Sequence, residues 1–121
     1  MMKVCYILAA IVVIATSEFV HAEDVDAGKT LYVDNCQRCH GNKGQGGVGA
    51  KLAGDAAYWQ SDVFNKAVLA GVDDEGKQVK KVMPRFGKVG LTKPNGAIPT
   101  ETELENVLAY LKTFGPKHSH R

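Results

Sequence analysis

Cys36-Gln37-Arg38-Cys39-His40 is the stretch of this 121-residue chain from which its fold can be predicted. Two thiols lie three positions apart, and an imidazole follows the second thiol directly. A disulfide between cysteines this close would close a very small loop and would stabilise the chain little. The spacing therefore indicates that these side chains carry chemistry.

Three kinds of site share some of this pattern. A zinc site needs four ligands, and the further candidates are His118 and His120 in the C-terminal tail. A thioredoxin-like pair is expected within a βαβ pattern, and no strand-like run flanks the motif. The CxxCH pattern is typical of c-type haem attachment, in which two thiols add to the vinyl groups of one haem. We therefore predict one haem c, attached through Cys36 and Cys39, with His40 as an iron ligand.

A second iron ligand is expected because haem iron in electron-transfer sites usually binds two side chains. Met83 is the one methionine beyond the first two positions, and Pro84 holds it in an extended conformation. A lone methionine more often fills a core. Here Lys81 and Arg85 surround it, so the segment has no apolar periodicity. We predict that Met83 joins His40 as a metal ligand.

Residues 1–22 are typical of a secretory signal peptide. Lys3 supplies a positive start, residues 4–15 form an apolar run, and Ala22 ends a small-residue cleavage pattern. Twelve apolar residues are too few to cross about 30 Å of hydrocarbon, although an uncleaved membrane anchor is the alternative. We expect cleavage of the signal, export of residues 23–121 to the periplasm, and no stable membrane insertion afterwards.

Composition excludes several other classes of protein. Fifteen Lys and Arg against thirteen Asp and Glu give a net charge of +2, and no basic block favours nucleic-acid binding. The glycines and prolines follow no period, which excludes collagen-like and low-complexity chains. The length suits one domain.

Helical patterns are separated by long loops. A first helix is expected at about residues 25–35, with Asp24 or Asp26 near its start. Ser61 is a good N-cap for a second helix, which Gly71 should end.

The C-terminal part of the chain holds the clearest helix signal. Thr100 and Glu103 form a capping box before an apolar stripe, and residues 115–116 should close that helix. Residues 41–54 contain six glycines and are expected to be a loop, and residues 72–81 are expected to be a solvated loop. No strand pattern of useful length is present, so the predicted class is all-α.

The chain resembles small class I c-type cytochromes of the bacterial, periplasmic kind, over a core of about residues 26–114. The resemblance implies three or more helices and long loops wrapped round one covalently bound haem. The residues that carry it are Gly28, Tyr32, Cys36, Cys39, His40 and Gly41, the distal Met loop at residues 82–87, and the last helix at residues 108–111.

The resemblance also implies a close crossing of the first and last helices. Its expected members are Gly28, Tyr32, Val107 and Tyr110. It further implies that the loop at residues 41–54 supplies a carbonyl to orient the ring of His40. Family members often have proline where this chain has Ala50. Tyr58 or Trp59 is expected to donate to a haem propionate.

The function implied is that of a single-electron carrier in a periplasmic respiratory or dehydrogenase-linked chain, and not that of an enzyme. Two axial ligands would leave no open iron position for a substrate. One alternative is a dedicated electron-accepting cytochrome subunit of a periplasmic oxidoreductase complex. Another is a ligand-binding or peroxidase-type haem protein, with Met83 off the iron.

Redox partner proteins are the expected partners: a dehydrogenase or reductase as donor and an oxidase or reductase as acceptor, both docking at the haem edge. Lysines are expected to ring that edge, with the acidic residues elsewhere, although ordinary solubility also explains them. The candidates are Lys43, Lys51, Lys80, Lys81 and Lys88. The long loop at residues 87–99 is expected to be inert, with a partner-specific surface as the alternative.

Overall fold

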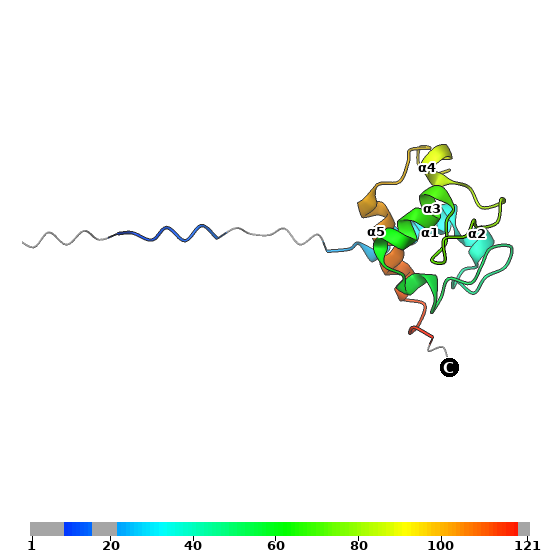
Figure 1. The fold of residues 1–121 in the computed structure, drawn as a ribbon, viewed down its shortest axis with the longest axis horizontal. Coiled ribbons are helices and arrows are strands. Elements are labelled where there is room, and N and C mark those ends of the chain that lie inside the picture. The colour runs from blue at the N-terminus through cyan, green and yellow to red at the C-terminus, as the bar shows by residue number, and fades with distance from the viewer. Residues whose placement is uncertain (1–8, 16–21, 119–121) are drawn as a thin grey trace, which may run out of the picture.

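The computed structural model describes residues 9–15 and 22–118, and within these residues the regular structure is helical (Figure 1). One isolated antiparallel bridge, Val72 to Gln78, is present in the same part of the chain. The all-α prediction is confirmed. The elements are α1 (Val25–Asn35), α2 (Gln37–His40), the 3-10 helix η1 (Ala56–Tyr58), α3 (Ser61–Ala70), α4 (Phe86–Val89) and α5 (Glu101–Lys112).

The first helix begins where its cap predicts. The side chain of Asp24 accepts a hydrogen bond from the Ala27 amide at 2.9 Å, which satisfies one of the free amides of the first turn. The Asp24 amide in turn donates to Oδ1 of Asn106 on α5 at 2.8 Å. The start of α1 is therefore tied to the last helix as well as capped locally.

The last helix has the expected capping box. Oγ1 of Thr100 accepts from the Glu103 amide at 3.1 Å, and Oε1 of Glu103 accepts from the Thr100 amide at 3.3 Å. The helix ends at Lys112, earlier than the expected stop at residues 115–116, because Thr113 and Phe114 form a turn. Its inner face is buried through Leu104, Asn106, Val107, Leu108 and Leu111.

The expected crossing of α1 and α5 is confirmed. A Cβ atom at Gly28 would overlap the carbonyl oxygen of Asn106 and lie 2.9 Å from the Val107 amide nitrogen. Tyr32, one turn later, is fully buried, and its ring centroid lies 5.5 Å from that of Tyr110 in an edge-to-face arrangement.

The third helix has the predicted end but not the predicted cap. Gly71 adopts a left-handed conformation with φ of 71° and stops the helix. Ser61 is the first helical residue rather than the N-cap, so that prediction is wrong. Gln60 occupies the cap position with extended backbone and provides no side-chain cap bond.

The short α4 was not predicted, because four residues carry no readable period. It packs beside α3, and Figure 1 shows the two next to each other. A Cβ atom at Gly87 would lie 2.7 Å from the Leu69 carbonyl oxygen, so glycine permits this close packing.

The segment after α4 is anchored rather than loose. Leu91 is buried, and its amide donates to the Ala97 carbonyl at 2.8 Å. Oδ1 of Asn35 accepts from the Thr92 amide at 2.9 Å, and Nδ2 of Asn35 donates to the Lys93 carbonyl at 3.1 Å. The last residue of α1 thus holds this loop.

Across residues 9–15 and 22–118, no helix combines the length and the apolar character that a membrane crossing requires. Most of the expected signal peptide lies outside the described residues, as does His120.

Candidate haem-binding site

A cavity of about 490 Å³ opens between the helices, and all four side chains predicted to bind haem line it. They are Cys36, Cys39, His40 and Met83. Much of the remaining lining is apolar, which suits a flat apolar ring system. It includes Tyr32, Leu52, Trp59, Phe64, Ala67, Val68, Phe86, Val107 and Leu111.

Cys36 lies at the break between α1 and α2, and Cys39 lies within α2. The Cys36 amide closes α1 by donating to the Tyr32 carbonyl at 2.8 Å, and α2 starts at the next residue. Burial, with a smaller contribution from Cys39, raises the pKa of the Cys36 thiol to about 12. The position therefore disfavours a thiolate and suits an uncharged thioether.

His40 is 8% exposed, and its ring is held from one side. Nδ1 lies 2.7 Å from the carbonyl oxygen of Ala50. A carbonyl only accepts, so Nδ1 carries the proton and Nε2 keeps the lone pair that a metal requires. The expected orienting carbonyl is confirmed, and it comes from Ala50 without the proline common in the family.

The glycine-rich loop fits closely round this imidazole. A Cβ atom at Gly49 would lie 2.8 Å from both Cε1 and Nδ1 of His40. The Gly49 amide donates to the Cys39 carbonyl at 2.8 Å, and the Gly46 amide donates to the His40 carbonyl at 2.8 Å. The loop therefore fixes the motif through its backbone as well as through Ala50.

Tyr32 has a second role that sequence reasoning missed. Its hydroxyl donates to the Gly41 carbonyl at 2.6 Å, directly after the CxxCH motif. Burial raises the pKa of Tyr32, so the hydroxyl stays a donor. The resemblance pointed to this tyrosine as a packing residue, and nothing in the local sequence indicates its bond.

The two candidates for a propionate donor are separated by the structure. The Tyr58 hydroxyl donates to the Gly115 carbonyl at 2.8 Å, and Tyr58 does not line the cavity. Trp59 does line it. Trp59 therefore fits the expected propionate donor better than Tyr58, whose hydroxyl already has an acceptor, and the donor stays a prediction.

The charged lining differs from the predicted ring of lysines. Of the five candidate lysines, Lys80 lines the cavity, whereas Asp55, Asp73 and Asp74 also line it. The expectation that acidic residues lie away from the site is wrong. The backbone bridge between Val72 and Gln78 turns the acidic loop back toward the cavity.

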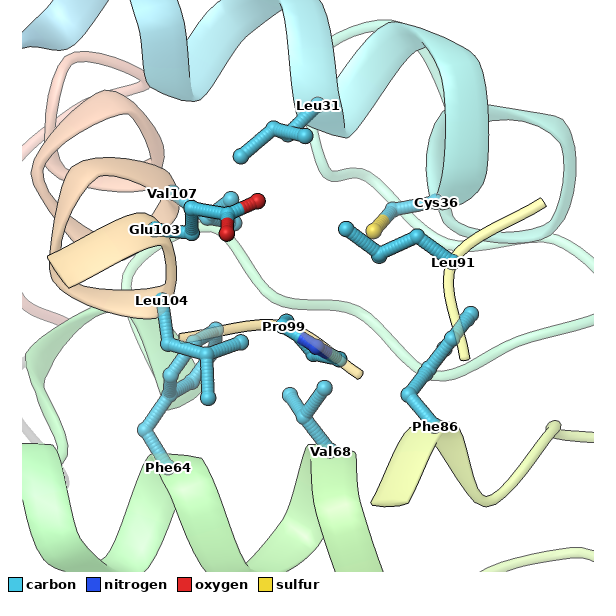
Figure 2. Close-up of a pocket in the computed structure, with 10 residues that line it drawn as sticks. All are labelled: Leu31, Cys36, Phe64, Val68, Phe86, Leu91, Pro99, Glu103, Leu104 and Val107. Atoms are coloured by element: carbon cyan, nitrogen blue, oxygen red, sulfur yellow. The ribbon is translucent and has the colours of Figure 1, made fainter. Parts of the chain in front are cut away.

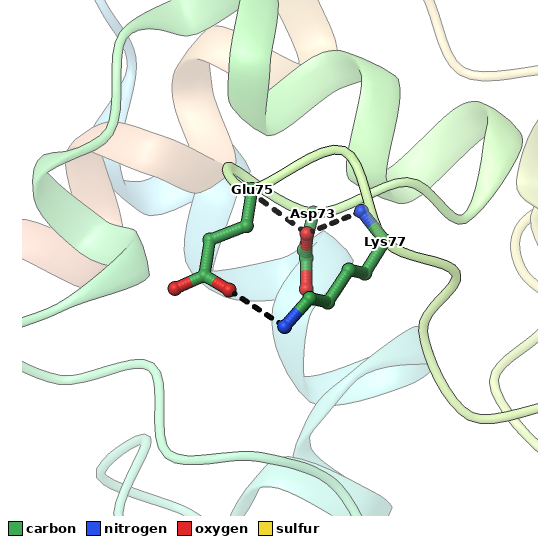
Figure 3. Close-up of polar contacts among 3 residues, drawn as sticks. All are labelled: Asp73, Glu75 and Lys77. Carbon is green, nitrogen blue, oxygen red and sulfur yellow. Dashed lines mark hydrogen bonds and ion pairs between the residues drawn. The ribbon is translucent and has the colours of Figure 1, made fainter.

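Figure 3 shows how that loop is held. One carboxylate oxygen of Asp73 accepts from the Glu75 amide at 3.0 Å and from the Lys77 amide at 2.8 Å. The Lys77 ammonium lies 3.2 Å from the Glu75 carboxylate, in an exposed pair that contributes little to stability. Asp73 is therefore a turn-forming residue, with its carboxylate bonded to backbone.

A second, small cavity of about 30 Å³ shares Cys36, Phe64 and Phe86 with the first one (Figure 2). Leu31, Leu91 and Cys36 border it together with apolar residues of α3 and α5. Glu103 also borders it, with its carboxylate engaged in the capping box. The loop after α4 thus covers Cys36 with an apolar side chain.

The described residues do not supply the further ligands that a zinc site at Cys36 and Cys39 would need. Among residues 9–15 and 22–118, no three His, Cys, Asp or Glu side chains lie together as a metal-binding group. His118 instead packs on the loop before η1, where its amide donates to the Gly54 carbonyl at 3.0 Å.

Comparison with known proteins gives the family. The family model described as Cytochrome c matches residues 25–115. Cytochrome c-554(547) of Halothiobacillus neapolitanus is 33% identical over 94 residues, which cover 77% of this chain and 99% of that protein. The Cbb3-type cytochrome c oxidase subunit CcoP of Cereibacter sphaeroides is 32% identical over 101 residues, which cover 77% of this chain and 32% of that protein.

A solved structure supports the fold. The c-type cytochrome XoxG from Methylobacterium extorquens AM1 superposes with a TM-score of 0.52 at 19% identity, covering 79% of this chain and 59% of that one. Family membership and the fit of the cavity agree on the cofactor, one haem c attached through Cys36 and Cys39. With an all-α fold, a cavity that fits haem c and a relative named cytochrome c-554(547), this chain belongs to the cytochrome c family as a small class I member.

Proposed function

We propose that this chain is a periplasmic single-electron carrier in which His40 and Met83 bind the haem iron. The observation that carries the proposal is the hydrogen bond from Nδ1 of His40 to Ala50, in a cavity that Met83 also lines. This bond leaves Nε2 as the metal-binding nitrogen. Haem c supplies a reversible one-electron change at its iron.

The protein's own residues hold the site in a state that suits electron transfer. Ala50 and Gly49 orient the imidazole, and the apolar part of the lining would shield a bound haem from water. A thioether sulfur from Met83 raises the reduction potential relative to a second nitrogen ligand. With His40 and Met83 both holding the iron, no position on it would be left for bond-making chemistry.

The cellular context is part of the proposal. Residues 1–22 are consistent with a secretory signal, so the functional domain is residues 23–121 and its compartment is the periplasm. The partners are then a donor and an acceptor protein of a respiratory or dehydrogenase-linked chain. Contacts of this class are small and transient.

A second candidate is a dedicated subunit of an oxidoreductase complex. One relative, CcoP, is named as an oxidase subunit, which favours this candidate. Gel filtration of a native extract separates the two roles, because a subunit co-elutes with a large complex and a carrier elutes at its own size.

Ligand spectroscopy tests the proposed ligands. Oxidised wild-type protein should show the weak red absorption band of iron–methionine ligation, and the reduced protein should bind carbon monoxide slowly. Met83→Leu should lose the band and bind carbon monoxide rapidly. Val89→Ala, a control at an exposed position that does not line the cavity, should behave as the wild type. A wild type without the band, with rapid carbon monoxide binding, would overturn the carrier and favour a ligand-binding haem protein.

A further inference from the structure

The guanidinium of Arg85 binds the segment that leads to Met83. Nη1 donates to the Met83 carbonyl at 2.8 Å and to the Lys80 carbonyl at 3.0 Å. Nη2 donates to the Val79 carbonyl at 3.0 Å and lies 3.4 Å from Oε1 of Gln78. One planar guanidinium thus donates to three backbone carbonyls within residues 79–83.

This segment has little other support. Residues 79–85 lie outside the helices, and Pro84 has no amide with which to donate. The Met83 amide donates to the Lys80 carbonyl at 3.1 Å, and the Val79 amide donates to the Gly71 carbonyl at 2.9 Å. The Val79 and Met83 carbonyls accept from Arg85, whose guanidinium presents five fixed donors and no acceptor.

Arg85 is itself fixed to the helical framework. Its carbonyl accepts from the Lys88 amide at 2.8 Å and from the Val89 amide at 3.1 Å, at the start of α4. A Cβ atom at Gly71 would collide with the guanidinium, so the glycine that ends α3 also makes room for this side chain. Arg85 therefore joins a loop without helical structure to two packed helices.

We propose that Arg85 is a positioning residue for Met83: its fork holds residues 78–83 in the shape that presents the Met83 thioether to the haem iron. The inference rests on the proposed function, in which Met83 is the iron ligand. Arg85 would thereby increase the fraction of time for which the Met83 sulfur is bound to the iron. A loosened sulfur exposes the iron to other ligands and lowers the reduction potential, since methionine ligation raises it.

The fork, rather than the charge, is the active feature. Lysine keeps the positive charge but is a single point donor, so it cannot bridge three carbonyls in one plane. The Arg85→Lys variant should therefore behave like Arg85→Gln and not like the wild type. Lys81→Gln is the matched control, because Lys81 is an exposed cation of the same segment and its loss changes the net charge as Arg85→Gln does.

The test uses the haem-loaded protein and three measurements. Arg85→Gln and Arg85→Lys should each weaken the red band at a temperature where the wild type keeps it. They should also lower the reduction potential. The rate of carbon monoxide binding to the reduced form should rise on the order of tenfold, for the loss of one or two charge-assisted bonds. Far-ultraviolet circular dichroism should stay unchanged. Lys81→Gln should match the wild type in the band and in the carbon monoxide rate.

A double substitution shows whether Arg85 acts through Met83. In a Met83→Leu background, which already lacks the red band, Arg85→Gln should not change the carbon monoxide rate further, since residues that act as one unit are not additive. Additive effects would overturn the inference, as would wild-type behaviour of Arg85→Lys. A wild type that lacks the red band would instead overturn the proposed Met83 ligation, and the inference with it.

Discussion

Gly28 on α1 lies directly against the backbone carbonyl of Asn106 on α5. The same Asn106 accepts the Asp24 amide through its side chain at 2.8 Å, so one buried residue meets α1 at two consecutive turns. The crossing sets the path of α1 toward Tyr32. From there the chain leads directly into the motif that carries the haem.

Gly28→Ala should destabilise the haem-loaded protein by about 2 to 3 kcal/mol, because the new methyl group overlaps backbone that cannot move without separating the helices. Urea unfolding measures the change. Lys29→Ala, at the next and exposed position of the same helix, controls for helix propensity and should lie within about 0.5 kcal/mol of the wild type. Equal midpoints for the two variants would refute the close crossing.

Tyr32→Phe should lower the free energy of unfolding at neutral pH by about 1 to 2 kcal/mol, because the hydrogen bond to the Gly41 carbonyl is lost. Tyr58→Phe removes a similar bond to a carbonyl and shows the general size of that loss.

The same variant should change the pH dependence. Burial raises the pKa of Tyr32 in the folded state, so the folded protein keeps a proton that the unfolded chain releases near pH 10. The contribution of protonated Tyr32 to the free energy of unfolding is complete below that pH and is lost as the pH rises above it. Unfolding free energies measured from pH 8 to 11 should therefore fall more steeply in the wild type than in Tyr32→Phe. Parallel curves would contradict the assigned burial effect.

Asn35→Ala should release the loop after α4 without unfolding the helices. Asn35 holds the Thr92 amide and the Lys93 carbonyl, so its loss should cost about 1 to 2 kcal/mol and speed amide hydrogen exchange at Thr92. Asn35→Asp keeps the acceptor for Thr92 and loses the donor, and should give an intermediate rate. Unchanged exchange in Asn35→Ala would show that the buried Leu91 alone anchors the loop.

Local signals account for the parts of the fold that were predictable. Asp24 and the Thr100–Glu103 box mark helix starts within a few residues, and a left-handed Gly71 marks an end, so α1, α3 and α5 follow from the sequence. The short α4 and η1 carry no period and depend on tertiary packing. Tertiary packing also decides the start of α3, where Gln60 rather than Ser61 takes the N-cap position.

The site was predictable where its chemistry is contiguous. Cys36, Cys39 and His40 share one motif, so their meeting in one cavity is local geometry. The roles of Asn106 and Asp73 were not predictable. Asn106 bonds a residue 82 positions away, and Asp73 reaches the cavity because its loop folds back on itself.

Removal of the cofactor should abolish the fold. Without haem the apolar lining of a cavity of about 490 Å³ faces no partner, and a domain this small has little other core. The double change Cys36→Ala, Cys39→Ala should give a largely unfolded, protease-sensitive chain. Cys36→Ala alone, with one thioether left, should retain a lower melting transition. A cooperative melt of the double variant without haem would contradict this prediction.

Charge at the cavity rim should control the approach of small redox reagents. Lys80 lines the cavity, so it should attract an anionic oxidant and repel a cationic one. Oxidation of the reduced protein by hexacyanoferrate(III) should slow as salt rises, because a Debye length of about 10 Å at 0.1 M screens the lysine.

Charge reversal then separates a steering site from ordinary solubility. Lys80→Glu should slow oxidation by hexacyanoferrate(III) several-fold, roughly the scale of local steering, and speed oxidation by a cationic cobalt(III) complex. Lys88→Glu makes the same change in net charge on α4, where the lysine is exposed and does not line the cavity, and should have a smaller effect. Equal effects of the two variants would mean that net charge alone acts. A wild type that prefers the cationic reagent would mean that Asp55, Asp73 and Asp74 outweigh the lysine, and that the docking partner carries a basic face.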